Sequence, residues 1–401
     1  MRIALVHRTF SPLGGTERYG LDLARALIEA GDEVHLVAHS VDGAPEGIHW
    51  HRVPMLAAGR LGKLVSFLMA STHVLRRAEG RSAPFDIVLG LGRTLEQDVL
   101  RVGGGCHQAY LKAVEGWKDG RSPSPLGLEP YHRAVLALER RQMQLSRTRH
   151  VIAVSHRVKA ELLEHYPISP DAVSVIHNGV DLERFDPERV GSVEEVREAL
   201  GIPSEAFVAL FVGNGLERKG FDMALEAFAR FATDARRLGV QRPLKLLVVG
   251  QDAARRSRAL EGWRRRLVSS DARLELVGMQ RAVERFYRAA DVLLLPTRYE
   301  PFGNVCLEAL AMGCPVVTSR CNGAAELLEG EAMTLVVTDP DAARVWALAL
   351  RSLLDPARHA RLKELSRKLA ERSSLKLHGW NVRAVLERTA DERHGRQDRG
   401  R

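Results

Sequence analysis

Two glutamates lie in a short segment whose residue types could bind a polyhydroxylated ligand. The segment follows the apolar run 292–295 and reads, from residue 298 to residue 313, Arg-Tyr-Glu-Pro-Phe-Gly-Asn-Val-Cys-Leu-Glu-Ala-Leu-Ala-Met-Gly. From Val305 the pattern predicts a short helix that is apolar on nearly all sides and therefore buried, with Glu308 as its only acid. A buried carboxylate without partners is costly. The two hydroxyl donors of a ribose would satisfy Glu308, and an internal salt bridge to an arginine is the alternative.

Glu300 stands eight positions before Glu308, at the expected carboxyl end of a strand, where ligands bind in open parallel sheets. We expect the backbone of the residues that follow it to contribute binding groups: Pro301, Phe302, Gly303, Asn304 and Val305. A carboxylate and the amides of residues 302–304 can together hold sugar hydroxyls. The alternative is that Glu300 is a solvated acid that favours the positive end of the helix dipole.

A glycine-rich loop carries two adjacent cations at the start of another predicted helix. Residues 213–220 read Gly-Asn-Gly-Leu-Glu-Arg-Lys-Gly. Cations are unfavourable beside a helix N-terminus, and a bound anion would reverse that penalty. We expect Arg218 and Lys219, together with Gly213 and Asn214, to bind a pyrophosphate. The loop lacks the Gly-Lys-Ser/Thr ending of a Walker motif, and the alternative is a solvated Arg-Lys pair.

A pair of glycines opens the first predicted helix of the chain. Gly14 and Gly15 precede Thr16, and glycines at a helix N-terminus let the backbone approach an anion. We therefore include both glycines among the candidate ligand-binding residues. The alternative is an ordinary strand-to-helix turn with Thr16 as N-cap. The spacing does not match the dinucleotide fingerprint Gly-x-Gly-x-x-Gly.

The elements that position these segments alternate between strands and helices in both halves of the chain. Apolar runs predict buried strands, and periodicity of three to four residues predicts helices. The predicted strands are 3–6, 33–38, 87–90, 151–154, 208–212, 244–249, 274–277, 292–295 and 316–318. The predicted helices that open after glycine-bearing loops are 16–30 and 221–231. Strand–helix–strand units of this length imply parallel sheets, so we expect an α/β protein with two Rossmann-like domains.

The chain of 401 residues is too long for one ordinary core and suits two domains. We expect a first domain at residues 1–178 and a second at residues 179–375, with the hinge near 178–186. Residues 376–401 should form a helix that returns toward the first domain and then a polar tail, which we expect to be disordered from Ala390.

The composition narrows the partners and the compartment. The formal net charge is +9, which favours anionic partners such as nucleic acid, anionic lipid or phosphorylated small molecules. The four cysteines form no Cys-x-x-Cys pair, so we expect a reducing compartment and no metal cluster. The first residues are too weakly apolar for a signal peptide, and no apolar run approaches a membrane span. These features predict a cytoplasmic protein.

The stretch from Leu295 to Val317 resembles the donor-site signature of the family 4 glycosyltransferases, which are retaining enzymes of the GT-B fold. The family's Glu-x7-Glu hallmark is matched by Glu300 and Glu308. Its glycine pair near the N-terminus and its Arg/Lys pair on the second domain are also matched. The resemblance covers nearly the whole chain. It implies two Rossmann-like domains that face each other across a cleft, with the acceptor on the first and a nucleotide-sugar donor on the second.

The resemblance also implies roles for the candidate residues. Glu308 would bind the donor ribose, and Glu300 with the backbone after it would hold the sugar. Arg218 and Lys219 would neutralise the diphosphate and stabilise the departing nucleotide. The glycine pair would lie against the phosphate or the acceptor. The family often has a histidine of the first domain facing the transferred sugar, and His107, in Gly-Gly-Cys-His, is the candidate.

Within the family, residues 11–15, 218–220 and 248–252 look most like the lipopolysaccharide core glucosyltransferases. The Pro-Phe-Gly that follows Glu300 is instead found in mannosyltransferases and other members. We therefore favour UDP-glucose as donor and keep UDP-N-acetylglucosamine and GDP-mannose open. The expected acceptor is a hydroxyl of a cell-envelope glycan or glycolipid, such as lipopolysaccharide core.

Other functions use the same architecture or the same charge. A sugar-nucleotide epimerase would act on the donor without an acceptor, and a phosphorylase would need a cofactor lysine that no feature marks. A non-catalytic protein that binds nucleotide-sugars or nucleic acid would have no use for the two glutamates, and no nucleic-acid-binding motif is present. We expect no nucleic-acid partner.

The expected mechanism requires neither a cofactor nor a metal. No carboxylate nucleophile is evident, so we favour attack of the acceptor on the face that the diphosphate leaves. No Asp-x-Asp motif is evident at the end of a strand, so we expect no divalent metal. Peripheral contact with an anionic inner membrane is a further expectation, because basic, aliphatic and aromatic residues alternate in two segments. The residues concerned are Arg60, Leu61, Lys63, Leu64, Val65, Leu68, Arg76 and Arg77 in the first segment, and Trp117, Lys118, Arg121, Arg133, Arg140 and Arg141 in the second.

Overall fold

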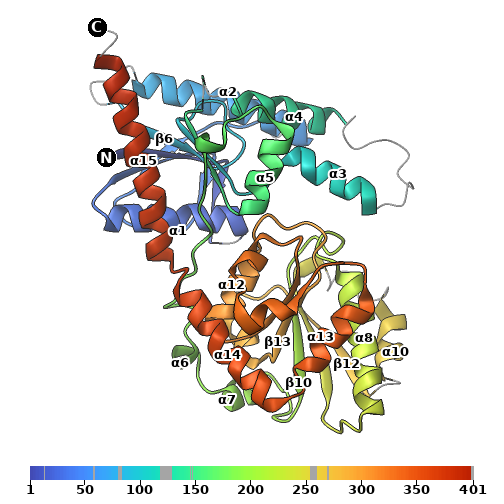
Figure 1. Ribbon diagram of the computed structural model, residues 1–401. Coiled ribbons are helices and arrows are strands. Elements are labelled where there is room, and N and C mark those ends of the chain that lie inside the picture. Colours follow the sequence, from blue (N-terminus) through green and yellow to red (C-terminus); the bar gives the residue numbers. More distant parts are fainter. Residues whose placement is uncertain are drawn as a thin grey trace. The chain divides into compact units, whose positions relative to one another are not determined.

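The structure is a computed structural model, and the chain forms two compact units (Figure 1). Unit 1 comprises Met1–Gly179 and Leu375–Arg401, and unit 2 comprises Val180–Ser374. The predicted domain boundaries lie within one residue of this division. The structure describes the chain except for residues 13, 57–58, 80–83, 118–128, 145, 147, 253–259, 269–270 and 399–401, and the side chains of residues 79, 117 and 394–398.

Unit 1 is built on a parallel sheet whose seven strands run in the order β5-β3-β1-β6-β7-β8-β9. These strands are β1 (Arg2–Val6), β3 (Glu33–Ala38), β5 (His49–Arg52), β6 (Ile87–Gly90), β7 (Val99–Val102), β8 (His150–Ala153) and β9 (Val173–Val175). A separate short pair joins β2 (Thr9–Phe10) and β4 (Ser40–Val41). All the strands that the apolar runs predicted in this half are present. Strands β5, β7 and β9 were not predicted, because they are short and carry polar residues.

Helices cover both faces of the unit 1 sheet, because successive side chains of a strand point to opposite faces. Ile3 and Leu5 of β1 join one apolar cluster with α1 and α15, and Ala4 and Val6 join another with α2. Both clusters exclude water from the central strands. The helices of the unit are α1 (Gly15–Glu29), α2 (Gly59–Glu79), α3 (His107–Trp117), α4 (Pro130–Gln142), α5 (His156–His165) and α15 (Leu375–Asp398).

Helix α15 extends through the segment that we expected to be disordered. It packs along α1 in unit 1 (Figure 1) and continues to Asp398. Leu386 and Ala390 are buried in the cluster with α1, and Arg393 forms an ion pair with Asp98 at 3.1 Å. The prediction of disorder from Ala390 is wrong, because apolar contacts and this ion pair hold a segment whose composition alone is polar.

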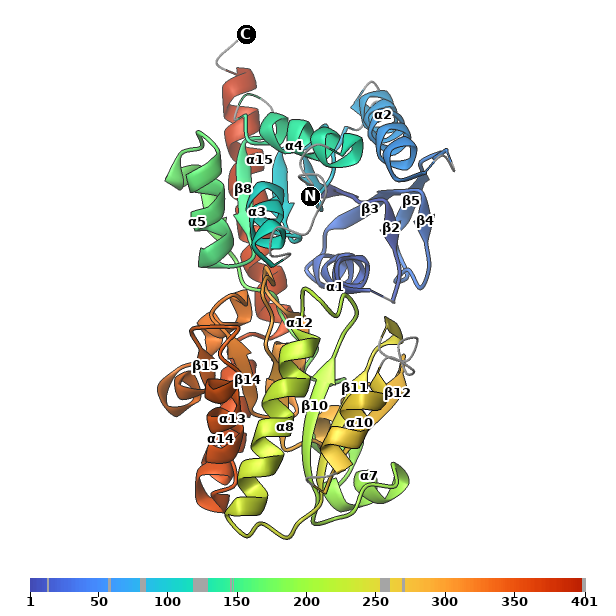
Figure 2. The ribbon, with the colours of Figure 1, turned by 90° about the vertical axis from the view of Figure 1, so that its right-hand side faces the viewer.

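Unit 2 is built on a second parallel sheet, with the strand order β12-β11-β10-β13-β14-β15. Figure 2 shows this sheet with β15 on the left and β12 on the right. Its strands are β10 (Phe207–Val212), β11 (Leu244–Val249), β12 (Ala272–Gly278), β13 (Val292–Leu295), β14 (Val316–Ser319) and β15 (Val336–Val337). Strand β10 lies in the interior of the sheet and is buried along its whole length, which is typical of strands covered on both faces.

The helices of unit 2 pack in pairs around its sheet. Helix α8 lies against α13, and α12 lies against α14. The helices are α6 (Pro187–Val190), α7 (Val193–Ala199), α8 (Phe221–Arg237), α10 (Glu261–Val268), α11 (Glu284–Ala289), α12 (Asn304–Ala311), α13 (Ala343–Ser352) and α14 (Pro356–Glu371). Short 3-10 turns occupy Gly323–Leu327 and Gly330–Leu335 in unit 2, and Pro170–Ala172 forms another in unit 1. The two glycine-bearing loops of the sequence therefore open α1 in unit 1 and α8 in unit 2.

The structure reduces the set of residues that could contact a membrane in the two segments named above. Within the described residues, no helix combines the length and the apolar character that crossing a bilayer requires. On α2, Leu61 and Val65 are exposed, but Leu64 and Leu68 are buried against α4 and cannot contact lipid. In the second segment, Lys118, Arg121 and the side chain of Trp117 lie outside the described residues.

Candidate active site

The loop between β10 and α8 needs glycine at both ends. Gly213 has a φ of +143° and Gly220 a φ of +67°. A Cβ on Gly213 would lie 2.5 Å from Cδ of Lys219, and a Cβ on Gly220 would lie 1.9 Å from the carbonyl oxygen of Pro296. The first glycine leaves room for the lysine side chain, and the second lets the loop approach the segment after β13.

Glu300 contacts both cations of this loop. Nη1 of Arg218 donates to Oε2 of Glu300 at 2.7 Å, and Nζ of Lys219 lies 3.4 Å from the same oxygen. Burial acts to raise the pKa of Glu300, but the charges of Lys219 and Arg218 outweigh it and hold the pKa below its ordinary value. Lys219 itself is buried. This cluster therefore places two cations and one carboxylate beside the start of α8.

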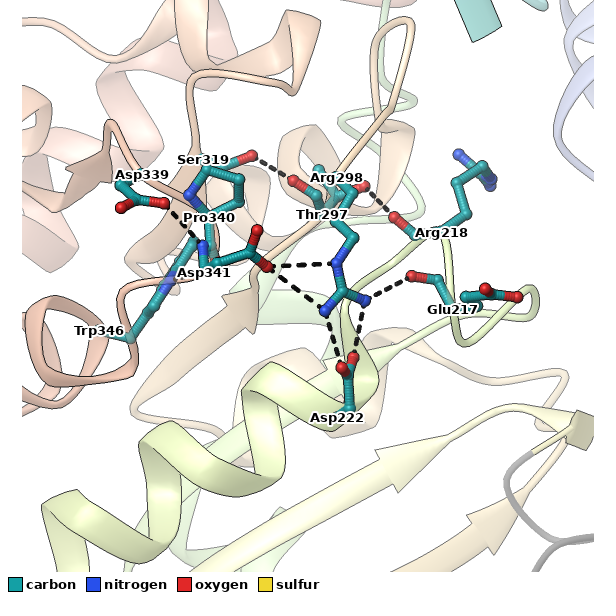
Figure 3. Close-up of polar contacts among 10 residues, drawn as sticks. All are labelled: Glu217, Arg218, Asp222, Thr297, Arg298, Ser319, Asp339, Pro340, Asp341 and Trp346. Carbon is teal, nitrogen blue, oxygen red and sulfur yellow. Dashed lines mark hydrogen bonds and ion pairs between the residues drawn. The ribbon is translucent and has the colours of Figure 1, made fainter. Parts of the chain in front are cut away.

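Arg298 braces this loop against the segment after β13 (Figure 3). Its guanidinium donates to both carboxylate oxygens of Asp222, at 2.8 and 2.7 Å, and to the carbonyl of Glu217 at 3.1 Å. The backbone amide of Arg298 and the hydroxyl of Thr297 both donate to the carbonyl of Arg218, each at 2.9 Å. Bidentate arginine–carboxylate contacts fix geometry well. The loop and the glutamate segment are thus held as one piece.

An Asp-x-Asp sequence that we did not recognise follows a strand that we did not predict. Asp339-Pro340-Asp341 begins two residues after the end of β15. Oδ1 of Asp339 accepts the amide of Asp341 at 3.0 Å, and Oδ1 of Asp341 lies 3.4 Å from Nε of Arg298 (Figure 3). The expectation that no such motif ends a strand is wrong for this short edge strand. Both carboxylates are engaged within the protein, one by a turn and one by an arginine.

The segment from Pro301 to Asn304 packs against Asn322, which the sequence analysis missed. Gly303 adopts a φ of +83°, and a Cβ on it would lie 2.6 Å from Oδ1 of Asn322. Asn322 is buried, and its Nδ2 donates to the hydroxyl of Thr318 at 3.0 Å. Glu300 is tied to the same region, since its amide donates to the carbonyl of Cys321 at 3.0 Å. The backbone after Glu300 is therefore fixed before any ligand binds.

Glu308 has a partner that the sequence analysis did not anticipate. The carboxylate is half-buried rather than fully buried, because it lies on the side of α12 that faces α11. The hydroxyl of Tyr287, from α11, donates to Oε2 of Glu308 at 2.9 Å. Tyr287 is fully buried, and burial together with the charge of Glu308 raises its pKa. The expectation of a buried acid without a protein partner is wrong, and the tyrosine orients the carboxylate.

Asn214 is exposed, and its side chain supports a neighbouring turn. Its Oδ1 accepts the amide of Gln251 at 2.9 Å. A Cβ on Gly250 would lie 2.3 Å from the carbonyl oxygen of Gly213, so the ends of β10 and β11 approach closely. This contact orders the first part of the loop, and a direct contact between Asn214 and a ligand stays a prediction.

The glycine pair of unit 1 opens α1 without a side-chain cap. Gly14 occupies the N-cap position with a φ of +100°, and the helix begins at Gly15. Thr16 therefore lies inside the helix, and the alternative that it is the N-cap is wrong. The positive end of a helix of 15 residues lies here, and such an end favours negative charge.

His107 begins α3 and lines a cavity of unit 1 with a volume of about 260 Å³. Its Nε2 lies 3.0 Å from Nδ1 of His132. Burial, with the charges of Arg93, His132 and Arg60, lowers the pKa of His107 to about 4. The ring is therefore neutral at physiological pH, and it can donate or accept one hydrogen bond to a ligand in the cavity.

The structure thus brings together the unit 2 candidates and assigns the others to unit 1. Arg218, Lys219 and Glu300 are in direct contact, and Gly213 packs against the lysine. Glu308 lies on the helix that the same segment opens. Gly14, Gly15 and His107 belong to unit 1. The missed residues Tyr287, Asn322 and Asp222 carried no local signal, because their partners lie elsewhere in the chain.

Comparisons with known proteins agree with this architecture. The sequence model described as Glycosyltransferase Family 4 matches residues 13–184, and the one described as Glycosyl transferases group 1 matches residues 206–356. A probable transglycosylase of Burkholderia thailandensis is 32% identical over 86% of this chain and 83% of its own. The lipopolysaccharide glucosyltransferase WaaG of Escherichia coli is 24% identical over 85% of this chain and 86% of its own.

Solved structures show the same fold. The crystal structure of WaaG, a glycosyltransferase involved in lipopolysaccharide biosynthesis, has a TM-score of 0.79 at 23% identity and covers 96% of this chain and 99% of its own. HepE of Anabaena, in complex with UDP and glucose, has a TM-score of 0.65 at 18% identity, with 96% and 99% covered. Two Rossmann-like domains of this kind define the GT-B fold. The two sequence models and the relative that is 32% identical identify the chain as a glycosyltransferase. The chain belongs to glycosyltransferase family 4, as the sequence resemblance predicted.

Proposed function

We propose that this glycosyltransferase moves a hexose from a nucleotide-diphosphate sugar to a hydroxyl of a cell-envelope glycan or glycolipid such as lipopolysaccharide core, with retention at the anomeric carbon. The observation that carries the proposal is the contact of Arg218 and Lys219 with Glu300 beside the start of α8. Two cations at a helix N-terminus suit a diphosphate. A carboxylate beside them suits the hydroxyls of the sugar that the diphosphate carries.

Charge development gives the mechanism. Rupture of the anomeric bond leaves positive charge on the sugar and adds negative charge to the diphosphate. Arg218 and Lys219 are held in place before the reaction, so they stabilise the transition state more than the ground state. In this proposal the acceptor hydroxyl attacks on the face from which the diphosphate departs, and the departing phosphate takes the hydroxyl proton. That geometry retains the anomeric configuration.

UDP-glucose is the favoured donor, with UDP-N-acetylglucosamine and GDP-mannose as the other candidates. HepE, with the same fold, was solved with UDP and glucose, and WaaG is named a glucosyltransferase. Glu308, oriented by the Tyr287 hydroxyl, would accept the hydroxyls of the ribose. All three donors carry a ribose that can make this contact, so the contact does not distinguish uridine from guanosine.

We further propose that transfer needs no cofactor and no divalent metal, because the arginine and the lysine supply the cationic charge at the diphosphate. The proposed location is the cytoplasm, with peripheral contact to the anionic inner membrane. The exposed Leu61, Val65 and Met69 of α2 support that contact, and Leu61 and Val65 lie beside the basic residues Arg60 and Lys63. Sedimentation with anionic vesicles at low salt tests it, and no binding there would remove the membrane from the proposal.

The first test is a thermal-shift panel of UDP, GDP, ADP and their common sugar conjugates. A ligand at about 100 times its Kd stabilises the protein by roughly 2.7 kcal/mol, which is a readable shift. We expect the uridine series to give the largest shift and Glu308→Gln to reduce it. Glu194→Gln, an exposed acid of α7, is the matched control. No shift with any nucleotide would overturn the donor assignment.

Once the donor is identified, two further measurements test the mechanism and the need for a metal. The anomeric proton of the product, followed by NMR, should report retention, and inversion would overturn the mechanism. Turnover should survive treatment with EDTA, and recovery only on addition of a divalent metal would overturn the cofactor proposal.

A further inference from the structure

The cavity of unit 1 collects basic side chains from four separate segments. Its lining includes the cations Arg8, Arg60, Lys63, Arg93 and Arg101, and the acids Glu17 and Glu139. Arg8 follows β1, Arg60 and Lys63 belong to α2, Arg93 follows β6, and Arg101 belongs to β7. Four of the five cations are arginines, whose planar guanidinium matches a phosphate.

One of the two acids of the cavity is engaged by a helix N-terminus, and the other lies close to one. The carboxylate of Glu139 accepts the amide of His107 at 2.8 and 3.1 Å, at the start of α3. Glu17 folds back over the start of α1, since a Cβ on Gly14 would lie 2.6 Å from its Oε2. Backbone amides therefore engage the carboxylate of Glu139, one of the two acids of the cavity. Among the described residues, none of the five cations forms an ion pair with a carboxylate.

Arg101 is the clearest unbalanced charge. It is 2% exposed, its Nη2 donates to Oδ1 of Asn178 at 2.6 Å, and its guanidinium carbon lies 3.4 Å from the centre of the Tyr19 ring. Its buried Nε has no hydrogen-bond acceptor within the described part of the chain. Burying a charge without an opposite charge costs several kcal/mol. An anion bound beside Arg101 would offset this cost, which would explain why the fold contains a buried arginine here.

The guanidinium reaches the cavity at the turn that precedes α3. A Cβ on Gly103 would lie 2.2 Å from Nη1 of Arg101, so only glycine fits between this group and the cavity wall. Gly103, Gly104 and Gly105 all line the cavity. The glycine turn thus lets a ligand approach the buried charge closely.

We propose that this cavity is an acceptor site that recognises a phosphomonoester on the acceptor, through Arg101 at its base and Arg60 and Arg93 at its mouth. The inference rests on the proposed function, because it names the chemical class of the acceptor for that transfer. The volume of about 260 Å³ is small for a ligand cavity and suits one phosphorylated sugar unit. The neutral ring of His107, on the same wall, is placed to meet a hydroxyl of that unit.

The mouth of the cavity supplies variants that should fold normally. Arg60 and Arg93 are exposed, and both contact Tyr131: the Arg60 guanidinium lies 4.1 Å from the ring centre, and Arg93 donates to the hydroxyl. Arg77, exposed at the other end of α2, is the matched control for Arg60. Each variant replaces arginine by glutamine.

The test is isothermal titration of the full chain with glucose 6-phosphate, glucose and inorganic phosphate. We expect glucose 6-phosphate to bind and glucose to bind far more weakly. Arg60→Gln and Arg93→Gln should each raise the Kd about tenfold, as the loss of one charge-assisted hydrogen bond does, and Arg77→Gln should not. Equal binding of glucose and its phosphate, or wild-type affinity in both mouth variants, would overturn the proposal.

A second arm separates a soluble phosphate from one carried by a lipid. Sedimentation compares vesicles of phosphatidylcholine with and without phosphatidate. Binding only to phosphatidate vesicles that Arg93→Gln weakens supports a lipid-borne acceptor, and glucose 6-phosphate binding without vesicle binding supports a soluble one. Binding to neither would overturn the phosphate site.

These outcomes are independent of the donor assignment. A nucleotide shift with binding neither to glucose 6-phosphate nor to phosphatidate vesicles would reject the acceptor class and leave the proposed function standing. Sugar-phosphate binding that depends on Arg93, with no nucleotide shift, would reject the donor assignment and leave the phosphate site standing.

Discussion

Glu300 is central to the proposed donor chemistry, because its carboxylate already neutralises part of the charge of the two cations that the diphosphate would contact. Its Oε2 lies 2.7 Å from Arg218 and 3.4 Å from Lys219. A bound diphosphate would therefore share these cations with Glu300. The carboxylate would be drawn toward the positive charge that develops on the sugar.

We predict that Glu300→Gln separates donor binding from turnover. Glutamine keeps the shape of the side chain but leaves both cations unbalanced, so affinity for UDP should be unchanged or higher. The kcat should fall about a hundredfold, the size of effect seen when one transition-state contact is removed. Steady-state kinetics and titration with UDP measure the two effects.

Glu217→Gln is the control for this prediction. Glu217 is an exposed acid of the same loop, and its side chain lies apart from the contacts of Arg298 (Figure 3). It should behave as wild type. A Glu300→Gln enzyme with normal kcat would show that Glu300 only neutralises the loop.

At the level of elements, the site depends on how closely the start of α8 approaches the segment after β13. Gly220 allows that approach, since a Cβ there would lie 1.9 Å from the carbonyl oxygen of Pro296. Gly239, just beyond the other end of α8, has a similar φ of +77° but open space around it. The two glycines share a left-handed backbone conformation and differ in the contact.

We predict that Gly220→Ala abolishes the thermal shift by nucleotide, whereas Gly239→Ala keeps it. Both variants should lose about 1–2 kcal/mol of stability, because alanine is strained in the left-handed region. Only Gly220→Ala must also move the loop that carries Arg218 and Lys219. A normal nucleotide shift in Gly220→Ala would show that the loop tolerates this displacement.

At the level of the whole chain, α15 connects the end of the sequence to the core of unit 1 through a buried histidine. Nδ1 of His378 donates to the carbonyl of His177 at 2.7 Å, so Nε2 must accept the hydroxyl of Tyr19, at 2.9 Å. These partners define one neutral tautomer. Burial and the charge of Arg101 lower the pKa of His378 to about 3.

We predict that acid destabilises unit 1 through this group. The unfolded chain takes up the proton near pH 6.5, whereas the folded chain does not until about pH 3, so stability falls as pH falls below 6.5. At pH 5 the loss is roughly 2 kcal/mol, or about 4–8 °C in Tm. His378→Gln should show a smaller difference in Tm between pH 7.5 and pH 5.

The exposed His73 provides the comparison, because His73→Gln should keep the wild-type difference. Other histidines of unit 1, such as the half-buried His107, also have lowered pKa values and should leave part of the acid sensitivity in place. An unchanged pH dependence in His378→Gln would place the effect entirely in those groups.

The sequence by itself determined the parts of this protein that depend on neighbours along the chain. Apolar runs specified buried strands, and the glycines of residues 213–220 marked a loop where backbone and ligand approach. The spacing of Glu300 and Glu308 marked the family, because one strand, one turn and one helix place both acids. These signals are local, so they are visible without the fold.

Only the tertiary structure decided which charges meet, because pairs distant in the sequence depend on sheet order and register. Glu300 meets Arg218 because β13 pairs with β10, and Tyr287 meets Glu308 because α11 lies against α12. Arg101 is one polar residue within a strand, and no local pattern shows that its charge stays unbalanced. Helix α15 is ordered to Asp398 because it packs on unit 1, which the polar composition of its last residues conceals.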